Sequence, residues 1–303
     1  MPKQALSTPF ITFVFRHFSI NVNTDLFVLV SRIYGFIKEF MEKLFVIKIG
    51  GNVIDDEKTL QSFLKDFAAI EGKKILIHGG GKIATKIGEQ SGIESKYING
   101  RRITDDATID LVTMVYGGLV NKKIVAQLQS VNCNAIGLTG ADGNIIPATK
   151  RPVKDVDFGW VGDIESGKLK AESLKLLLEG ELIPVFAPLT HDGQGHMLNT
   201  NADTIASSLA VALSVNYDVG LIYCFEKKGI LKDANDNDSV INVMNKQTYQ
   251  QLLSEQKLFA GILPKIDNAF AAIDAGVKEV LVGDAKDLLQ NIGTKTSGTL
   301  FIQ

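Results

Sequence analysis

The sequence predicts an α/β protein built around a mainly parallel, buried sheet. Short apolar runs rich in Ile, Val and Leu alternate along the chain with stretches of helical periodicity, a pattern typical of parallel strands covered by helices. With 303 residues the chain is long enough to bury a full core. The predicted strands are 44–49, 74–78, 134–138, 183–187, 219–224 and 279–282. The predicted helices are 56–70, 82–91, 105–130, 171–179, 202–214, 246–256 and 265–275.

The first two predicted strands each run into glycines. Phe45-Val46-Ile47-Lys48-Ile49 is followed by Gly50-Gly51, and Ile75-Leu76-Ile77-His78 is followed by Gly79-Gly80-Gly81. A strand that ends in glycine before a helix brings bare backbone N–H groups close to a bound anion. Lys48 is predicted to lie at the carboxyl edge of the sheet, where ligands of open α/β folds bind. Together these features predict phosphate chemistry.

Later elements begin or end at turn and cap residues. Thr104 is predicted to cap the long helix that starts at 105. Two turn-rich segments, 140–143 and 191–195, predict hairpins or loops. The pattern of strands and helices restarts around 185–200, which predicts a second lobe. We therefore expect an N-terminal lobe over 44–185 and a C-terminal lobe over 186–303.

Residues 1–43 differ from the rest of the chain. Residues 26–43 have helical spacing of apolar residues, but charged residues interrupt the longest apolar runs before they reach the roughly 20 residues that span a bilayer. No small-residue cleavage site of a signal peptide is evident. The segment could be an amphipathic helix for oligomer contact, a weak targeting segment, or an upstream extension of a reading frame that starts at Met41.

Composition limits the class of partner. The chain is 45% hydrophobic and 22% charged with a net charge of −2, without the basic excess of a nucleic-acid-binding protein. Cys133 and Cys224 have no CxxC spacing, and the four histidines have no ligand-like spacing, so we expect a reducing cytoplasm and no protein metal site. We expect small-molecule substrates, no nucleic-acid or membrane partner, and a homodimer.

Known nucleotide motifs are absent, but further candidate residues follow the glycine loops. The sequence contains neither the GxxxxGK[ST] of a P-loop nor the GxGxxG of a dinucleotide fold. Asn199, Asn201 and Asp203 lie at the start of an apolar helix and could be turn and cap residues or part of a polar site. Arg102 could be a solvated loop charge or the partner of a carboxylate. Lys265 begins a helix, where a cation needs either a solvated tip or an anionic partner.

Taken in order, these residues resemble the amino-acid kinase family over about 44–303. The matching segments are Lys48-Ile-Gly-Gly, His78-Gly-Gly-Gly, Asn99-Gly-Arg-Arg-Ile-Thr104, Asn199-Thr-Asn-Ala-Asp203, Gly261-Ile-Leu-Pro-Lys265 and Gly298-Thr-Leu. The resemblance implies an open three-layer αβα sandwich whose N-terminal lobe holds an acyl-amino acid and whose C-terminal lobe holds ATP. The implied reaction is phosphorylation of the side-chain carboxylate of N-acetyl-L-glutamate in arginine biosynthesis, with Mg²⁺ carried on the nucleotide.

The resemblance also implies a role for each site residue. Lys48 and Lys265 would stabilise the transferring phosphoryl group, and Asp203 would orient both lysines. Arg102 and Asn199 would bind the α-carboxylate of the substrate. The other implied residues hold the phosphoryl group or the substrate's side-chain carboxylate, and they are Gly50, Gly51, Gly80, Gly81 and Asn201.

Other readings are open, and the chain departs from the family pattern. N-succinyl-L-glutamate or another carboxylate or carbamate are alternative acceptors, and a nucleotide-binding protein without turnover or an oxidoreductase are more remote. Phe225-Glu226-Lys227-Lys228 stands where the family usually has Ser/Thr-Asp, which affects the adenine pocket. The short C-terminal region, 283–303, lacks the signature of arginine-inhibited members, so we expect no arginine feedback.

Overall fold

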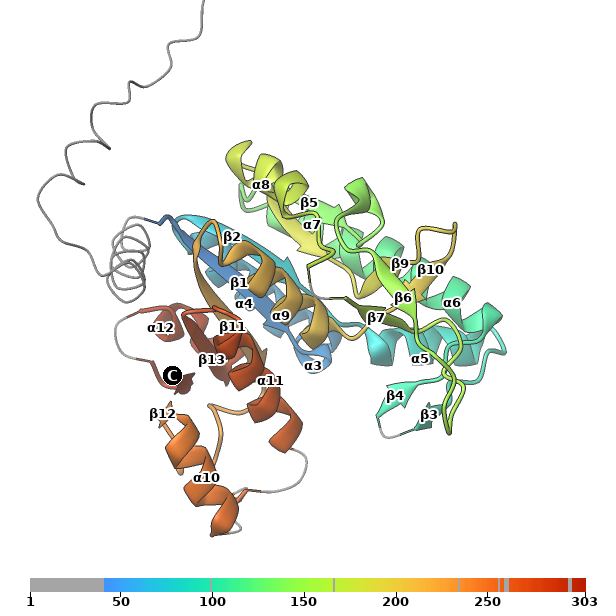
Figure 1. Cartoon of the computed structure of the whole chain (residues 1–303). Coiled ribbons are helices and arrows are strands. Elements are labelled where there is room, and N and C mark those ends of the chain that lie inside the picture. The colour runs from blue at the N-terminus through green and yellow to red at the C-terminus, as the bar shows by residue number, and fades with distance from the viewer. Residues whose placement is uncertain are drawn as a thin grey trace, which may run out of the picture. The chain divides into compact units, whose positions relative to one another are not determined.

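The computed structural model describes residues 41–303 except 99, 166, 234, 256, 259–261, 294 and 295 (Figure 1). Residues 1–40 of the predicted extension therefore lie outside the described residues, as do Asn99 and Gly261 of the family motifs and residue 256 of a predicted helix. No described helix is long and apolar enough to cross a membrane.

An eight-stranded sheet forms the centre of the protein, with strand order β12-β14-β13-β11-β1-β2-β8-β5. All neighbouring strands run parallel except β13 and β14. The strands are β1 (Lys43–Ile49), β2 (Lys73–Ile77), β5 (Ala135–Leu138), β8 (Ile183–Phe186), β11 (Asp218–Phe225), β12 (Val243–Met244), β13 (Glu279–Asp284) and β14 (Thr299–Phe301). The prediction of a mainly parallel sheet is confirmed, and all six predicted strands belong to it.

Three short antiparallel pairs lie beside the sheet, near α5 (Gly81–Gln90) and α6 (Asp106–Val112) in Figure 1. They are β3 (Tyr97–Ile98) with β4 (Arg101–Arg102), β6 (Ala148–Lys150) with β7 (Gly162–Ile164), and β9 (Leu189–His191) with β10 (Met197–Asn199). The turn-rich segment 191–195 connects β9 and β10, which confirms the predicted hairpin or loop. Segment 140–143 instead enters a short 3-10 helix, Asp142–Asn144.

Helices cover both faces of the sheet and create two hydrophobic cores, which confirms a three-layer αβα sandwich. One face carries α8 (Ala171–Glu179), α9 (Ala202–Leu213), α10 (Lys246–Ser254) and α11 (Leu263–Asp274). The other face carries α3 (Gly51–Asp55), α4 (Glu57–Ala69), α5, α6, the π-helix η1 (Thr113–Val120), α7 (Asn121–Gln129) and α12 (Leu288–Asn291). Apolar residues at helical spacing drive this arrangement, because each helix buries one stripe against the strands.

The predicted helix 105–130 is one helical run, but it changes geometry in the middle. Its central turns, Thr113–Val120, form a π-helix that contains Gly117-Gly118, a pair with weak α-helical preference. The predicted Thr104 cap is wrong, because Asp105 Oδ1 accepts from Thr108 N at 2.9 Å instead. Thr104 is fully buried one residue earlier, where its backbone pairs with the segment around Gly159. This pairing removes Thr104 from the cap position.

The two predicted lobes share one sheet. Strand β1 of the N-terminal half pairs along its whole length with β11 of the C-terminal half, from Lys43–Asp218 to Ile49–Cys224. Residues 42–303 therefore form one compact unit. The assignment of acyl-amino acid to 44–185 and of ATP to 186–303 stays a prediction.

Candidate active site

Strand alternation places Lys48 on the side of the sheet that faces α9. Leu44 and Val46 belong to the core on this face, and Lys48 has the same parity along β1. Asp203 is in the first turn of α9, and its Oδ1 lies 2.8 Å from Lys48 Nζ. Lys48 is 8% exposed, so this ion pair is largely shielded from water. The structure therefore brings together two predicted catalytic residues that are 155 positions apart in sequence.

Lys265 lies on the same side, over the ring of Phe225. Its Nζ is 3.6 Å from the ring centroid, and Lys48 Nζ is 5.2 Å from the same centroid. Lys265 lines a small hollow together with Asp203, Tyr223 and Phe225. Burial lowers the pKa of Lys265, and repulsion from Lys48 acts in the same direction, whereas the charges of Asp203 and Glu226 oppose this shift. Both lysines and the carboxylate thus form one electrostatic unit.

The two glycine loops lie side by side at the carboxyl ends of β1 and β2. A Cβ on Gly79 would lie 3.7 Å from Gly51 N, so the two loops are in backbone contact. Gly80 has a φ of 150°, and a Cβ there would lie 3.0 Å from the Tyr116 ring. Gly51 and Gly81 each have open space where a Cβ would stand, and each begins a helix. Their backbone N–H groups can therefore approach an anion closely.

Arg102 is a buried cation with neutral partners. It is 6% exposed, and its Nη2 donates to Gly81 O at 2.8 Å and to Thr85 Oγ1 at 2.9 Å. Its Nη1 donates to Ser95 Oγ, and its guanidinium carbon lies 4.8 Å from the Tyr97 ring centroid. Within the described part of the chain no carboxylate forms an ion pair with Arg102. A buried guanidinium without a carboxylate favours binding of an anionic ligand.

The predicted amide residues have different roles in the structure. Asn199 Nδ2 donates to Thr104 Oγ1 at 3.0 Å, which holds the end of β10 beside the segment after β4. Asn201 caps α9, since its Oδ1 accepts from Asp203 N at 2.8 Å and Thr204 N at 3.0 Å. Asn201 is therefore the cap of α9, and its phosphate-binding role stays a prediction.

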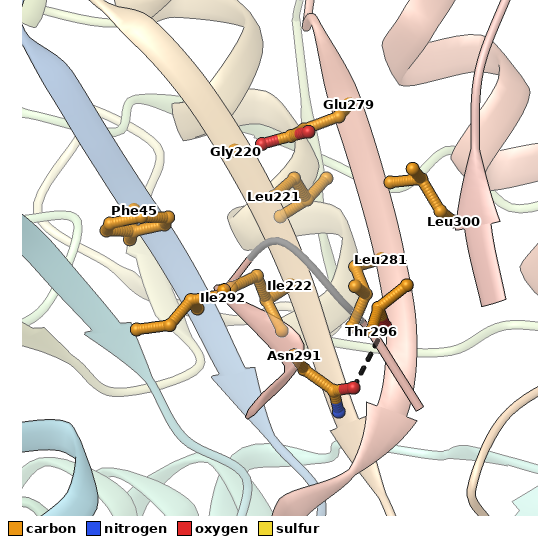
Figure 2. Close-up of a pocket in the computed structure, with 11 residues that line it drawn as sticks. Phe45, Gly220, Leu221, Ile222, Glu279, Leu281, Asn291, Ile292, Thr296 and Leu300 are labelled. Atoms are coloured by element: carbon orange, nitrogen blue, oxygen red, sulfur yellow. Dashed lines mark hydrogen bonds between the residues drawn. The ribbon is translucent and has the colours of Figure 1, made fainter. Parts of the chain in front are cut away.

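A cavity of about 380 Å³ joins most of these residues. Its lining includes predicted residues from three parts of the chain, namely Gly80, Gly81, Arg102, Asn199, Asn201 and Asp203. A second cavity, of about 260 Å³, lies between Phe45, Leu281 and Leu300, where Asn291 Oδ1 accepts from Thr296 Oγ1 (Figure 2). None of the predicted site residues lines it. The first cavity is therefore the candidate active site.

His78 contacts the backbone of the second glycine loop. It is fully buried, its Nδ1 lies 2.6 Å from Gly79 O, and its Nε2 lies 3.1 Å from Asn121 Nδ2. A ring that donates to the carbonyl and accepts from the amide must be neutral. Burial lowers the pKa of His78 to about 4, although the bond to Gly79 opposes the shift. His78 thus positions the loop without carrying charge at neutral pH.

This burial predicts a loss of stability in mild acid. Because the folded pKa is about 4 and the ordinary value is 6.5, the unfolded chain binds the extra proton between these pH values, and stability falls as pH falls. Between pH 7 and pH 5 the wild type should lose about 2 kcal/mol more unfolding free energy than His78→Gln, measured by urea titration. His196→Gln, at an exposed position, is the control and should keep the wild-type loss. An equal loss in His78→Gln and the wild type would contradict the assignment.

The sequence interpretation missed several residues beside the site. Tyr116 lines the cavity from the π-helix, and burial raises its pKa while Arg102 opposes the shift. Tyr97 packs on Arg102, and Asn121 holds His78. In the sequence Phe225 differs from the family pattern, but nothing local indicates that it contacts the lysines. A glycine pair inside a helical pattern was the one local signal near Tyr116; the other residues have no local pattern that marks them.

A parallel sheet with two glycine loops and two amines at its carboxyl edge defines an α/β protein that handles phosphate. The chain matches the profile of the Amino acid kinase family over residues 43–284 and belongs to that family. An acetylglutamate kinase of Bacteroides thetaiotaomicron is 57% identical over 254 residues, which are 84% of this chain and 98% of that protein. An acetylglutamate kinase of Methanopyrus kandleri is 35% identical and covers 82% of this chain and 98% of its own length. The expected family and the expected class of enzyme, a kinase, are confirmed.

Solved structures show the same fold. The chain is similar to smu.665 from Streptococcus mutans UA159, with a TM-score of 0.67 and 28% identity over 86% of this chain and 98% of that one. It is also similar to a carbamate kinase from Giardia lamblia bound to AMP-PNP, with a TM-score of 0.62 and 15% identity over 87% and 99% of the two chains. The second likeness shows the fold alone.

Proposed function

We propose that this protein is an ATP-dependent kinase that phosphorylates the side-chain carboxylate of N-acetyl-L-glutamate. The product is N-acetylglutamyl 5-phosphate, an intermediate of arginine biosynthesis. The observation that carries this proposal is the position of Asp203, which pairs with Lys48 and lines both the hollow of Lys265 and the cavity of Arg102. The buried Arg102 has no carboxylate partner among the described residues. Acetylglutamate kinases that are 53–57% identical to this chain support the choice of acceptor.

In this proposal catalysis is alignment and charge neutralisation. The bound nucleotide supplies the phosphoryl group, and the substrate carboxylate is already a nucleophile, so the chain needs no general base. Lys48 and Lys265 neutralise charge that develops on the transferring group, and Asp203 orients Lys48 through their ion pair. Arg102 and Asn199 hold the α-carboxylate, while backbone N–H groups of Gly51, Gly80 and Gly81, with Asn201, hold phosphate and the reacting carboxylate. The Gly50 N–H already donates to Cys224 O at 3.1 Å, so Gly50 serves as the turn that lets the loop follow β1.

The residues present fit a nucleotide that brings its own metal ion. Among the described residues no cluster of three or more His, Cys, Asp or Glu side chains could hold a metal ion. Asp203 is committed to Lys48, so its charge is already balanced by a protein amine. We propose that Mg²⁺ is bound by the nucleotide phosphates, where it supplies further charge neutralisation. We also propose that the protein works in the cytoplasm, as its unpaired Cys133 and Cys224 favour.

N-succinyl-L-glutamate is the second candidate acceptor, and one observation favours it. Arg101 and Arg151 line the same cavity as Arg102. Arg151 Nε donates to Asp163 Oδ1 at 3.1 Å, while its buried Nη1 has no hydrogen-bond partner among the described residues. An acyl group that ends in a carboxylate would bring a further anion to this cationic wall.

A coupled ADP-release assay with N-acetyl-, N-succinyl- and free L-glutamate tests the proposed function. We expect turnover with an acyl-glutamate and little with the free amino acid. ADP release that depends on none of the three compounds would contradict the proposal. If kcat/KM is higher for the succinyl compound, Arg151→Gln should lower that value selectively, because it removes a positive charge from the acyl end of the cavity.

We predict that the active protein is a homodimer and that residues 1–40 are not needed for activity. Residues 1–40 should be dispensable because every candidate site residue lies at or beyond Lys48. A shortened chain that begins at Met41 should keep kcat within about twofold of the full chain and keep its dimer mass by light scattering after size exclusion. If the full chain were a hexamer that falls to dimers on shortening, residues 26–43 would form an oligomer contact, and arginine should then be added to the assay.

A further inference from the structure

Phe225 brings an aromatic face to both predicted catalytic amines. It is the last residue of β11, and its ring centroid lies 3.6 Å from Lys265 Nζ and 5.2 Å from Lys48 Nζ. Both distances are within the range of about 6 Å over which the negative face of an aromatic ring attracts a cation. The two lysines come from β1 and α11, so one side chain interacts with amines from two different elements.

The ring is held in place by its neighbours. Phe225 stacks on Tyr223, with centroids 6.2 Å apart and an interplanar angle of 16°. Tyr223 lies opposite Lys48 in the pairing of β11 with β1. The two stacked rings therefore belong to the strand beside Lys48. A Cβ on Gly50 would lie 3.9 Å from Phe225 Cδ1, which places the ring against the backbone of the first glycine loop. The position of the ring is therefore fixed by the same strands and loop that form the site.

The two amines at this place have only one carboxylate within ion-pair distance among the described residues. Lys48 is paired with Asp203 at 2.8 Å, but no carboxylate among the described residues is within ion-pair distance of Lys265. Lys265 is half-buried beside a second cation, and burial and Lys48 both favour its neutral form, against Asp203 and Glu226. The face of the Phe225 ring attracts the charged amine and does not neutralise it, so the amine keeps its full charge for a phosphate group.

We propose that Phe225 is a positioning residue for phosphoryl transfer, whose ring holds the Lys265 amine, and more weakly the Lys48 amine, in place for the transferring group. This inference rests on the proposed kinase function. It predicts that loss of the ring affects the step in which charge develops more than it affects binding of the acyl-glutamate. In this proposal Phe225 acts on phosphoryl transfer through the lysines.

Steady-state kinetics of three variants test the proposal. Phe225→Leu keeps an apolar side chain but removes the ring, and it should lower kcat about tenfold with KM for the acyl-glutamate changed less than about twofold. Phe225→Tyr keeps the ring and should restore kcat to near the wild-type value. Phe45→Leu is the matched control, because Phe45 lies on β1 with Lys43 Nζ 5.5 Å from its ring and lines the other cavity; it should leave kcat unchanged. Equal losses in Phe225→Leu and Phe225→Tyr, or no loss in Phe225→Leu, would overturn the proposal.

NMR of the nucleotide-free protein gives a readout that does not depend on activity. With ¹³C-labelled lysine and the Lys265 signal assigned by Lys265→Arg, the Hε protons of Lys265 should resonate upfield because they lie over the ring. In Phe225→Leu this upfield displacement should disappear. The pKa of Lys265 should also fall, because the ring no longer stabilises the charged amine against burial and the repulsion of Lys48, and only Asp203 and Glu226 still favour the charged form. An ordinary Lys265 shift in the wild type would overturn the proposal even if Phe225→Leu does not fold. Wild type that turns over no acyl-glutamate, with the NMR result as expected, would contradict the proposed function alone.

Discussion

Replacement of Lys48 by alanine is expected to lower kcat about 100-fold or more, with a smaller change in KM for both substrates. The Lys48 residue is 8% exposed and its amine lies 2.8 Å from Asp203 Oδ1, so its charge acts in a site largely shielded from water. Charge that is fixed before the reaction stabilises the transition state more than the ground state. Steady-state kinetics with ATP and the acyl-glutamate each varied will separate kcat from the two KM values.

The result needs a control for folding, because Lys48→Ala leaves Asp203 without its partner. Lys43→Ala is matched, since Lys43 lies at the other end of β1 and pairs with Glu279 at 2.6 Å. Its kcat should be near that of the wild type, and thermal unfolding of both variants should show folded protein. Near-normal turnover in folded Lys48→Ala would remove Lys48 from the proposed machinery.

Arg102→Lys is expected to raise KM for the acyl-glutamate by roughly 10- to 100-fold, as when a hydrogen bond to a charged group worth about 1.5–3 kcal/mol is lost. Lysine keeps the charge but loses the planar fork that can bind a carboxylate while it also donates to Gly81 O and Thr85 Oγ1. KM for ATP should change little, because Arg102 lies in the cavity with Asn199 and not in the hollow with Lys265.

The two values of KM make this prediction testable in a single data set. A rise in KM for ATP alone would place Arg102 outside the acceptor pocket. A fall in kcat with unchanged KM values would indicate that Arg102 supports the Gly81 loop during the reaction and does not hold the substrate. Urea unfolding of Arg102→Lys will show whether the buried position tolerates the change.

Much of the fold was predictable because its signals are local. Runs of Val, Ile and Leu predicted six of the eight strands of the central sheet, and the short strands β12 and β14 were missed. Periods of 3.6 residues predicted the longer helices within a few residues of their observed ends, with 105–130 subdivided by its π-helix, and the short helices α3 and α12 were missed. The glycine loops after β1 and β2 were predictable for the same reason, since parallel strands bring their carboxyl ends to one edge. The sequence also suggested the pair Lys48 and Asp203 through its resemblance to a family.

Local patterns were insufficient wherever a residue's partner comes from a distant part of the chain. Thr104 looked like a helix cap, but pairing with the segment around Gly159 buried it and left the cap to Asp105. Asn201 could be a site residue or a cap, and only the structure shows that its Oδ1 accepts from the α9 backbone.

The sequence by itself determined the α/β class, the order of six central strands and the helices between them, the glycine loops and the family, because these depend on neighbours along the chain. Tertiary structure alone decided the surroundings of the charged groups. Arg102 is buried without a carboxylate among the described residues, burial keeps His78 neutral between Asn121 and Gly79, and Phe225 faces two amines. The physical reason is that burial and electrostatic attraction depend on distance in space, and packing of β1, β11, α9 and α11 brings together groups that are far apart in sequence.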